Sequence, residues 1–271
     1  MRMIRMIANK GVLQIFFAML LVVIVMFVSN YIVFKNSISE IYGQVSENNR
    51  LVTTNIIQSF DNFFRDINNV IHSINMLPYD DQFDTFNTYL MQKNIATFIS
   101  PTTMEYIEEA VIFFNGSDLA ITTTGTIDLD VLFKQKYRHG IYNSGYWKSY
   151  AASKHSLKVF PEAYYSEFTS PYAEIRKRLL IVAGSNQLSP KNVMILIDAE
   201  KLLKHVSQKT MMEGSSLIIL DQDRNVIFNT EKDWDLANVL DDLYFDAGRE
   251  TTLKRKGYEY NFFKSDYNGF I

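Results

Sequence analysis

Aromatic side chains that carry hydrogen-bonding groups are concentrated between residues 125 and 172. Tyrosine and tryptophan combine an apolar ring with an O–H or N–H donor, and small-molecule sites use this mixture for their walls and their few oriented contacts. The stretch therefore predicts a ligand-binding site. The alternative interpretation is that these rings only cover a β-sheet. The candidate residues are Tyr137, Arg138, Tyr142, Tyr146, Trp147, Tyr164 and Tyr165.

One carboxylate outside this stretch is a further candidate. Asp198 ends an apolar run, where burying an unpaired carboxylate would be costly. It could accept hydrogen bonds from a ligand amine, or it could cap a helix that begins immediately after it. The sequence favours the capping role, and Asp198 stays among the candidate ligand contacts.

No spacing of polar residues predicts catalysis. A metal site needs ligands at defined spacings, such as histidines three or four residues apart on one helix. The sequence contains no such pair, no phosphate-binding glycine loop and no Gly-x-Ser-x-Gly turn. We therefore predict a protein that is not an enzyme and that holds no metal or cofactor. The scattered histidines are His72, His139, His155 and His205.

The segment that begins at Asp221 resembles a calcium-binding loop in its first residues only. Such a loop requires glycine at its sixth position and glutamate at its twelfth. Val226 and Lys232 occupy these positions here. Residues 221–225 are therefore predicted to form a polar turn between two strands.

The elements that must position the candidate site begin with an apolar segment. Between Lys10 and Lys35 the chain has 24 residues without a charged side chain. At ~1.5 Å per residue, a helix of this length can cross a hydrocarbon layer of about 30 Å. The segment is longer than the apolar core of a signal peptide and lacks a small-residue cleavage site. We predict a permanent membrane span at residues 11–34, with a signal sequence or a buried core helix as the alternatives.

The charges that flank the span predict its orientation. Arg2, Arg5 and Lys10 precede it without an acidic residue, which places residues 1–10 in the cytoplasm and residues 35–271 outside it. The exported part carries 24 Lys and Arg residues against 30 Asp and Glu residues. It therefore lacks the concentrated positive charge of a nucleic-acid-binding protein. Because the chain has no cysteine, its domains must fold without disulfide bonds.

A long helix is predicted to follow the span at residues 35–78. Apolar residues recur there at intervals of three or four, apart from one longer step between Val45 and Val52. No proline interrupts the pattern before Pro78, where the helix should end. We expect the first half of this apolar stripe to pair with the same helix of a second subunit, forming a homodimer. The second half should pack on the globular part of the chain.

Two α+β domains are predicted after this long stalk helix, a larger domain at residues 79–208 and a smaller one at 209–271. Asn115 and Gly116 give a strong signal for a hairpin turn in the larger domain. The smaller domain ends in a new apolar run, so we expect it to be incomplete and the sequence to be a fragment. The larger domain should contain helices at 83–98 and 200–206, strands at 106–114, 119–124, 178–185 and 192–199, and an irregular segment at 125–172. The smaller should contain a strand–turn–strand unit at 215–230, a helix at 234–245 and a strand at 258–266.

Several short stretches together carry a resemblance to a known family. They are EEAVIFFNGSDLAITTTG at 108–125, YWKSY at 146–150, NVMILIDAEKLL at 192–203, LIILDQDRNVIFNT at 217–230 and FFKSDYNGFI at 262–271. With the span and the stalk helix, they resemble the double Cache sensor region of bacterial transmembrane receptors over residues 18–271. Within that group they look most like the sensor halves of Gram-positive AraC-type membrane regulators, followed by sensor histidine kinases of the same bacteria.

The resemblance implies two PAS-like domains, the larger one distal to the membrane, with a ligand pocket partly lined by Trp147. Family members of this kind sense small molecules and signal across the membrane. Those that bind amino acids share an Arg-x-Trp-Tyr segment and a later aspartate. Here Gly145 stands at the position of that arginine and Lys148 at the position of that tyrosine. A sugar therefore stays as open as an amino-acid-like ligand, and an adhesive anchor or a tethered cell-wall enzyme are the alternative functions.

Overall fold

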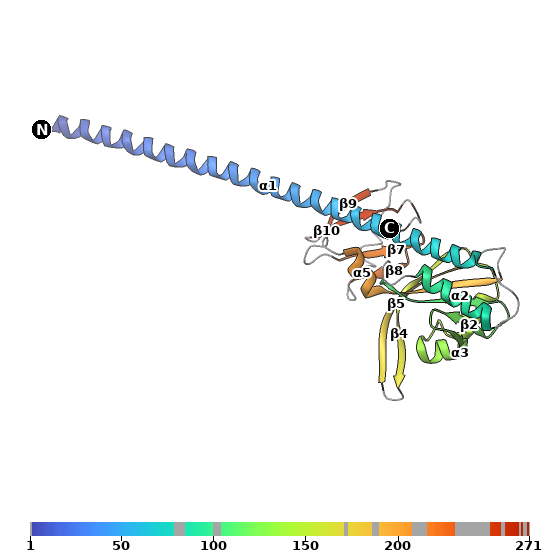
Figure 1. Ribbon diagram of the computed structural model, residues 1–271. Coiled ribbons are helices and arrows are strands. Elements are labelled where there is room, and N and C mark those ends of the chain that lie inside the picture. Colours follow the sequence, from blue (N-terminus) through green and yellow to red (C-terminus); the bar gives the residue numbers. More distant parts are fainter. Residues whose placement is uncertain are drawn as a thin grey trace. The chain divides into compact units, whose positions relative to one another are not determined.

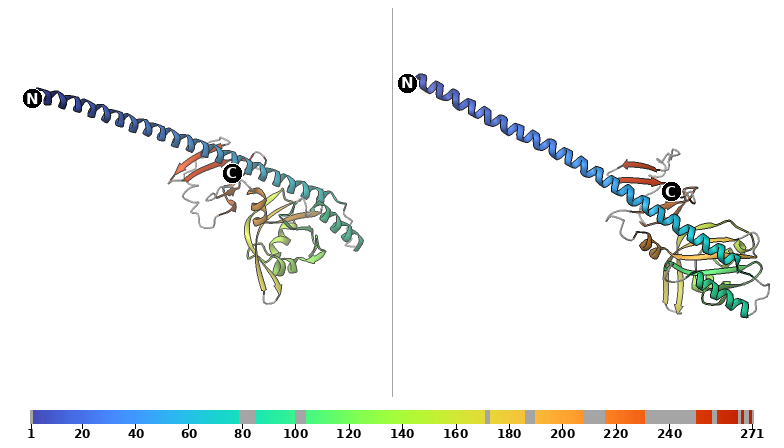
Figure 2. Two further views of the ribbon diagram at one scale, coloured as in Figure 1. Left: turned by 60° about the vertical axis from the view of Figure 1, so that its left-hand side comes forward. Right: turned by 45° about the horizontal axis from the view of Figure 1, so that its top comes forward.

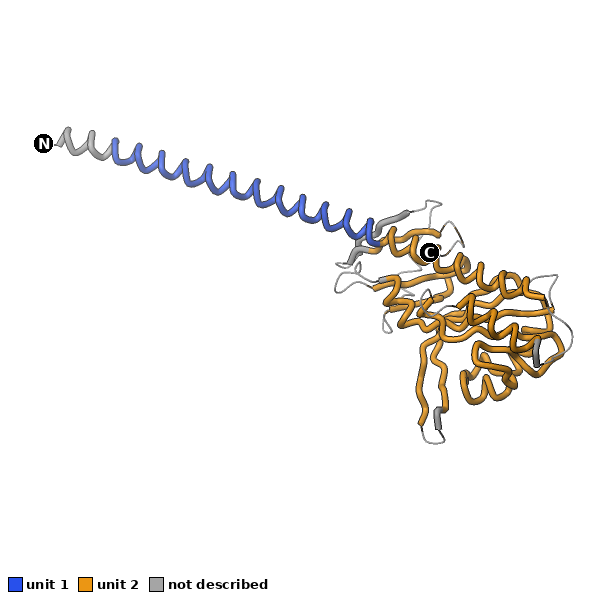
Figure 3. The backbone as a smooth tube through the Cα atoms, in the orientation of Figure 1, with its two compact units in different colours: residues 1–52 blue, residues 53–271 orange. Residues whose placement is uncertain are grey.

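The chain forms a long apolar helix followed by antiparallel sheets with further helices (Figure 1). The computed structural model describes residues 2–78, 85–99, 104–170, 173–185, 190–207, 216–230, 250–255 and 258–265, together with Tyr267 and Phe270. Two compact units divide the chain, Met1–Val52 (unit 1) and Thr53–Ile271 (unit 2), as coloured in Figure 3. The predicted α+β fold is confirmed.

Helix α1 (Arg2–Met76) contains every described residue of unit 1 and continues into unit 2. The large apolar side chains of the predicted span are exposed in the single chain, and this helix is long and apolar enough to cross a membrane. No proline removes a backbone N–H donor before Pro78, so nothing in the sequence interrupts the helix. The predicted span and the predicted stalk helix are therefore one continuous helix.

Within unit 2, α1 buries the second half of its apolar stripe, as expected. Ile67 and Ile74 are completely buried, and their neighbours on this face are buried as well. The carboxyl end of α1 is held by a residue of the sheet, because Lys191 Nζ donates hydrogen bonds to the carbonyl oxygens of Ile74 (3.2 Å) and Leu77. The carbonyl oxygen of Ile74 also accepts a hydrogen bond from the backbone N–H of Leu77 (3.2 Å), so Lys191 adds to the closure of this helix end. The other buried residues of this half are Ile56, Phe60, Phe63, Phe64, Val70 and Ile71.

A six-stranded antiparallel sheet in the order β3-β2-β1-β6-β5-β4 forms the body of unit 2. Gly116 closes the predicted turn between β1 and β2 with φ +80°, a conformation that glycine adopts without steric cost. The sheet is therefore built from hairpins at both edges, with β1 and β6 at its centre. Its strands are β1 (Ile107–Phe114), β2 (Leu119–Thr122), β3 (Thr126–Asp128), β4 (Lys158–Ser170), β5 (Ala173–Ser185) and β6 (Lys191–Asp198).

Helices cover both faces of this sheet. Because side chains alternate along a strand, Val111 and Phe113 lie on one face and Ile112 on the other, and all three are buried. α1 and α2 lie along one face, and α3, η1 and α4 lie on the other (Figure 1 and Figure 2). α5 follows β6. These elements are α2 (Thr85–Phe98), α3 (Leu129–Val131), the π-helical turn η1 (Leu132–Lys136), α4 (Ser144–Ala151) and α5 (Ala199–Ser207).

One prediction for this domain is wrong. The segment at 125–172, expected to be irregular, contains short helices and the whole of β4. Pro161 lowers the strand propensity of this sequence, but proline is tolerated on an edge strand, and β4 is the edge strand beside β5. The strand also bends there, because its pairing with β5 shifts register between Phe160 and Ala163. β5 begins before the predicted start at Arg178, since its polar first half pairs with β4.

Two smaller antiparallel sheets follow. β7 (Ile218–Leu220) and β8 (Val226–Asn229) form the predicted strand–turn–strand unit. Asp221 holds the turn, because one carboxylate oxygen accepts from the backbone N–H groups of Asp223 (2.9 Å) and Asn225 (2.8 Å). β9 (Glu250–Arg255), which was not predicted, pairs with β10 (Tyr258–Phe263), which was. The predicted helix at 234–245 lies outside the described residues, and the domain bounds at 208 and 209 stay a prediction.

Candidate functional site

Four of the predicted site residues lie together against the sheet. Tyr142, Tyr146 and Trp147 belong to α4 and the segment before it, and Tyr165 belongs to β4. With Phe160 of β4 and with His139 they form a continuous set of ring contacts, which we call the aromatic cluster. α4 begins here because the Asn143 side chain accepts a hydrogen bond from Tyr146 N (3.0 Å) and so caps the helix.

Trp147 lies at the base of the aromatic cluster and is completely buried. Its ring centroid is 5.0 Å from that of Phe160 and 5.7 Å from that of Phe133 of η1. Its indole N–H donates to the carbonyl oxygen of Tyr142 (3.2 Å), which fixes the segment before α4. Trp147 therefore packs against the sheet, as in the alternative interpretation that these rings cover a β-sheet.

Tyr165 carries a buried hydroxyl group without a hydrogen-bond partner among the described residues. Burial raises the pKa of its phenol above the usual range, so the group stays protonated and can donate. Tyr150 of α4 carries a second such hydroxyl, and burial raises its pKa to about 12. Leaving a buried hydroxyl unpaired costs about 1–3 kcal/mol, which a polar group of a ligand could recover.

Tyr142 and Tyr146 form the outer part of the aromatic cluster and are half-buried. Their ring centroids are 5.0 Å apart in an edge-to-face arrangement, and each ring also contacts Phe160. Burial raises the pKa of Tyr146, with a smaller contribution from Tyr142. These two rings and Phe160 therefore form one wall of the aromatic cluster.

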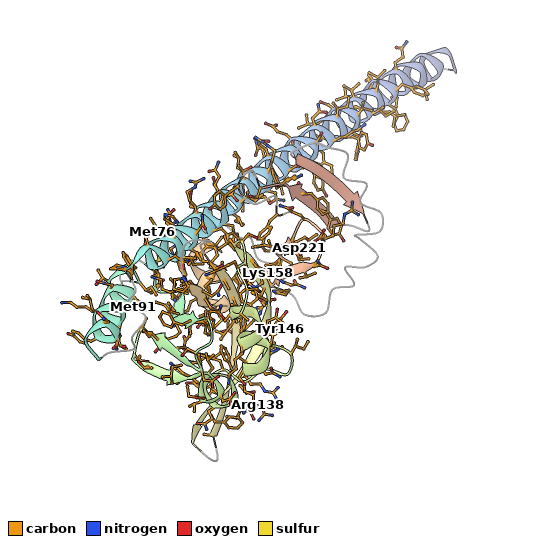
Figure 4. All side chains as sticks on the ribbon, turned by 90° about the vertical axis from the view of Figure 1, so that its right-hand side faces the viewer. Met76, Met91, Arg138, Tyr146, Lys158 and Asp221 are labelled. Carbon is orange, nitrogen blue, oxygen red and sulfur yellow. The ribbon has the colours of Figure 1, made fainter. Side chains whose placement is uncertain are left out.

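The remaining candidates, Arg138, Tyr137 and Tyr164, are not part of the aromatic cluster. Arg138 is exposed on the outer edge of β4, where its backbone pairs with Ser166 and its guanidinium group lies 5.3 Å from the ring centroid of Phe168. Tyr164 is exposed on the face of β4 opposite Tyr165, and Tyr137 is buried in the core. Arg138 and Tyr146 both lie in the part of unit 2 away from Met76 at the end of α1 (Figure 4).

Asp198 performs the capping role in this structure. Its carboxylate accepts hydrogen bonds from the backbone N–H groups of Glu200 and Lys201, both at 3.0 Å, at the start of α5. Its own backbone N–H donates to the carbonyl oxygen of Tyr106 (2.9 Å). Its described contacts do not include the aromatic cluster.

No protein-family model matches the chain, and no curated protein matches it. Solved structures do match. The ligand-binding domain of the Campylobacter jejuni chemoreceptor Tlp3 in complex with 4-methylisoleucine is similar with a TM-score of 0.50 and 12% identity, covering 83% of this chain and 87% of that one. The Tlp3 sensory domain with isoleucine bound matches with a TM-score of 0.50 and 12% identity, covering 84% of this chain and 90% of that one. The sensory domain described without a named ligand gives a TM-score of 0.50 and 13% identity, covering 84% of this chain and 91% of that one.

The chain has the fold of a chemoreceptor sensory domain. Each likeness extends over more than four fifths of this chain and supports the α+β fold of a sensory domain. At 12–13% identity the likeness concerns the fold alone, and the residues of the site must be argued from this chain.

In this sensory-domain fold, two adjacent buried residues connect the aromatic cluster with α1. Asn192 Nδ2 donates hydrogen bonds to the carbonyl oxygens of Ala151 (2.9 Å) and Ser153 (3.4 Å), at the end of α4. Lys191, directly before it at the start of β6, holds the end of α1. Both side chains are 1% exposed. Among the described residues, these two neighbours therefore provide one hydrogen-bonded connection between the end of α4 and the end of α1.

Sequence analysis missed His139, Phe160, Lys191 and Asn192. Phe160 precedes Pro161 in a strand that was not predicted. His139 is a lone histidine, and Lys191 and Asn192 lie where a turn gives way to a strand. No local spacing distinguishes these residues from surface positions, because their partners lie on distant elements.

Proposed function

We propose that the chain senses a small extracytoplasmic molecule and transmits its binding across a membrane. The sensory-domain fold and the single long apolar helix support this proposal. We assign residues 11–34 to the span, residues 35–78 to the stalk helix, residues 79–208 to a membrane-distal sensor domain and residues 209–271 to a membrane-proximal one. The domains then lie outside the cell and the N-terminus in the cytoplasm, as the flanking charges favour.

The ligand binds at the aromatic cluster. The observation that carries this assignment is the buried hydroxyl of Tyr165, which has no hydrogen-bond partner among the residues described and lies beside rings that can form apolar walls. Tyr142, Tyr146 and Trp147 supply these walls, and Arg138 stands at the outer edge of β4. Asp198 is assigned to capping α5 rather than to the ligand.

The ligand class follows from the character of these residues. Aromatic walls with phenolic hydroxyl groups suit a small molecule that has an apolar part and a few polar groups. The similar Tlp3 domains hold isoleucine and 4-methylisoleucine, which favours an apolar amino-acid-like ligand for this chain as well. A sugar that stacks on the rings is the second class.

Signalling would use the connection from α4 to α1. A ligand that separates Tyr142 and Tyr146 shifts α4, and Asn192 and Lys191 convey the shift to the end of α1. The ligand can bias this balance only by its difference in affinity for the two arrangements. The stalk helices of a homodimer would carry the change across the membrane to an AraC-type transcriptional regulator or, as the alternative, a histidine kinase.

Isothermal titration of the full chain in detergent micelles with isoleucine, valine, glucose and maltose tests the ligand class. Tyr165→Phe should lower the affinity for the binding compound about tenfold, the equivalent of one hydrogen bond of about 1.4 kcal/mol. The same variant should not lose stability, because the hydroxyl has no hydrogen-bond partner in the part of the chain that the structure describes. Tyr164→Phe, which removes the exposed neighbouring hydroxyl, is the matched control and should bind like wild type. Equal affinities for Tyr165→Phe and wild type would contradict the proposal that the ligand binds at the aromatic cluster.

A further inference from the structure

His139 contacts the segment that carries Tyr142, both through its ring and through hydrogen bonds to the backbone. Its ring is stacked on Tyr142 (centroids 5.0 Å apart, planes 18° apart) and lies 4.9 Å from the ring of Tyr165 on β4. Its Nδ1 atom accepts hydrogen bonds from the backbone N–H groups of Ile141 (3.1 Å) and Tyr142 (3.0 Å). One imidazole nitrogen therefore closes the turn that carries Tyr142, and the imidazole ring joins this turn to Tyr165 of β4.

Only neutral imidazole can make these contacts. An acceptor nitrogen must carry a free lone pair, and both ring nitrogens of the imidazolium ion are donors. Protonation at Nδ1 would turn two attractive hydrogen bonds into contacts between a donor and two N–H groups. The turn therefore depends on the protonation state of one side chain.

We propose that His139 is a positioning residue that keeps the Tyr142 segment closed against Phe160 of β4, and that acid releases this segment by protonating His139. The consequence for a ligand rests on the proposed function, because the released segment is the outer wall of the proposed site. Release moves one wall of the proposed site, the Tyr142 ring, and leaves Tyr165 on β4.

We attribute the pH dependence of the release to protonation of His139 itself, because the groups that face it are phenols. From its own segment it faces the phenol of Tyr142, and from β4 it faces the phenol of Tyr165. The neighbouring Arg138 turns to Phe168 instead. Burial lowers the pKa of His139 below 6.5, and no charged group contributes among the described residues.

The sign of the effect follows from this direction. Above pH 6.5 the imidazole is neutral whether the segment is closed or open, so the closed arrangement keeps its full stability. As the pH falls from 6.5 through the lower pKa of the closed form, the open form binds more protons. The closed arrangement is therefore lost on acidification.

Trp147 provides a ligand-free readout, because its indole N–H is bonded to the carbonyl oxygen of Tyr142. Trp234→Phe leaves Trp147 as the single tryptophan of the full chain. In micelles without added ligand, the emission maximum of Trp147 should move to longer wavelength between pH 8 and pH 5, with a midpoint below 6.5. Far-UV circular dichroism should stay constant over this range, which separates release of the segment from unfolding.

Variants of His139 decide the proposal. In the same background, His139→Asn should abolish the shift, because the asparagine carbonyl oxygen can accept from the following N–H groups and does not titrate. His139→Ala should show the long-wavelength emission already at pH 8, since nothing then closes the turn. His72→Gln, at an exposed histidine of α1, is the matched control and should keep the wild-type profile.

Two results would overturn the inference: a wild-type emission that does not change between pH 8 and 5, or an unchanged profile in His139→Asn. Neither result depends on a ligand, so both are independent of the proposed function. A failure of isoleucine and the other probes to bind would count against the proposed site and leave the emission profiles to decide the role of His139.

Discussion

At the scale of single residues, the buried polar groups of unit 2 are of two kinds. Some have hydrogen-bond partners within the chain. Glu109, which is 2% exposed, accepts hydrogen bonds from Thr123 N (2.9 Å) and Lys136 Nζ (2.8 Å). Others, including the hydroxyls of Tyr150 and Tyr165, have no partner among the described residues. Groups of the first kind stabilise the fold. Those of the second kind are where a ligand can gain free energy, because buried polar groups are normally paired.

Substitutions of Trp147 should separate its packing from its hydrogen bond. Trp147→Ala removes a fully buried ring and should lower the free energy of unfolding by about 3–5 kcal/mol. Trp147→Phe keeps most of the apolar volume and loses the hydrogen bond to Tyr142, so it should cost about 1–2 kcal/mol. Urea unfolding followed by far-UV circular dichroism measures both. An alanine variant as stable as the phenylalanine variant would contradict the buried position.

Lys191 should make stability depend on pH in the alkaline range. Burial lowers its pKa from 10.5 to about 8, so between these values the unfolded chain binds more protons than the folded chain. Stability contributed by this residue therefore rises with pH across that window, by at most about 1.4 kcal/mol per pH unit. Urea unfolding at pH 8, 9 and 10 should show wild type gaining stability relative to Lys191→Met.

The control for this measurement is an exposed lysine. Lys134→Met removes a lysine whose side chain is 65% exposed and is measured in the same way. A difference for Lys191→Met that changes with pH no more than that of Lys134→Met would show that the Lys191 side chain keeps contact with water.

The sequence predicted residue roles where the role depends on the nearest neighbours in the chain. Asp198 is such a case, because a helix cap needs only the N–H groups of the next residues. The roles of His139 and Lys191 could not be predicted in this way. Lys191 bonds to a carbonyl oxygen 117 residues earlier, and His139 contacts a strand whose existence was not predicted.

At the scale of elements, apolar periodicity found those that bury a whole face. The second half of α1, β1 and β6 are of this kind, and the predicted end of α1 and the predicted bounds of both strands agree with the structure to within a few residues. β4 was missed because its outer half is not buried: Tyr164 is 46% exposed and Phe168 is 36% exposed. Backbone pairing with β5 forms this strand, and a hydropathy pattern does not report backbone pairing.

The two halves of α1 should respond differently to the same substitution. Ile74 is completely buried in unit 2, so Ile74→Ala should lower the free energy of unfolding by about 2–5 kcal/mol. Ile41 is 59% exposed in the single chain, so Ile41→Ala should change it by less than about 0.5 kcal/mol. Thermal or urea unfolding of the full chain in micelles compares the two.

The proposed homodimer adds a second expectation for the same helix. If the first half of the stripe pairs with its copy, Ile41→Glu should reduce cross-linking between chains while leaving the unfolding of unit 2 unchanged. Undiminished cross-linking would remove Ile41 from the dimer contact.

At the scale of the whole of unit 2, polar contacts around Arg178 join the six-stranded sheet to the β7–β8 hairpin. Arg178 of β5 donates to the carboxylate of Glu162 of β4 and to the carbonyl oxygen of Asn229 of β8. Asn229 N in turn donates to the Glu162 carboxylate (3.0 Å). The guanidinium group also lies 5.1 Å from the ring centroid of Phe228, and that ring contacts Phe60 of α1. The two sheets and α1 therefore meet at Arg178.

Removing Arg178 should loosen the β7–β8 hairpin selectively. Arg178 and Glu162 are only 11% and 14% exposed, so Arg178→Met leaves a carboxylate unpaired in a largely buried position, which costs about 3–5 kcal/mol. Part of that free energy holds the hairpin against the larger domain, so hydrogen exchange should accelerate at residues 218–229 and stay slow in β1 and β6. Arg176→Met, two residues away on β5 at a side chain that is 74% exposed, should leave exchange unchanged.

Adding Glu162→Gln to Arg178→Met should recover part of the lost stability, because the uncompensated charge is then gone. Equal acceleration throughout unit 2 would mean that Arg178 supports the fold as a whole and does not join its parts.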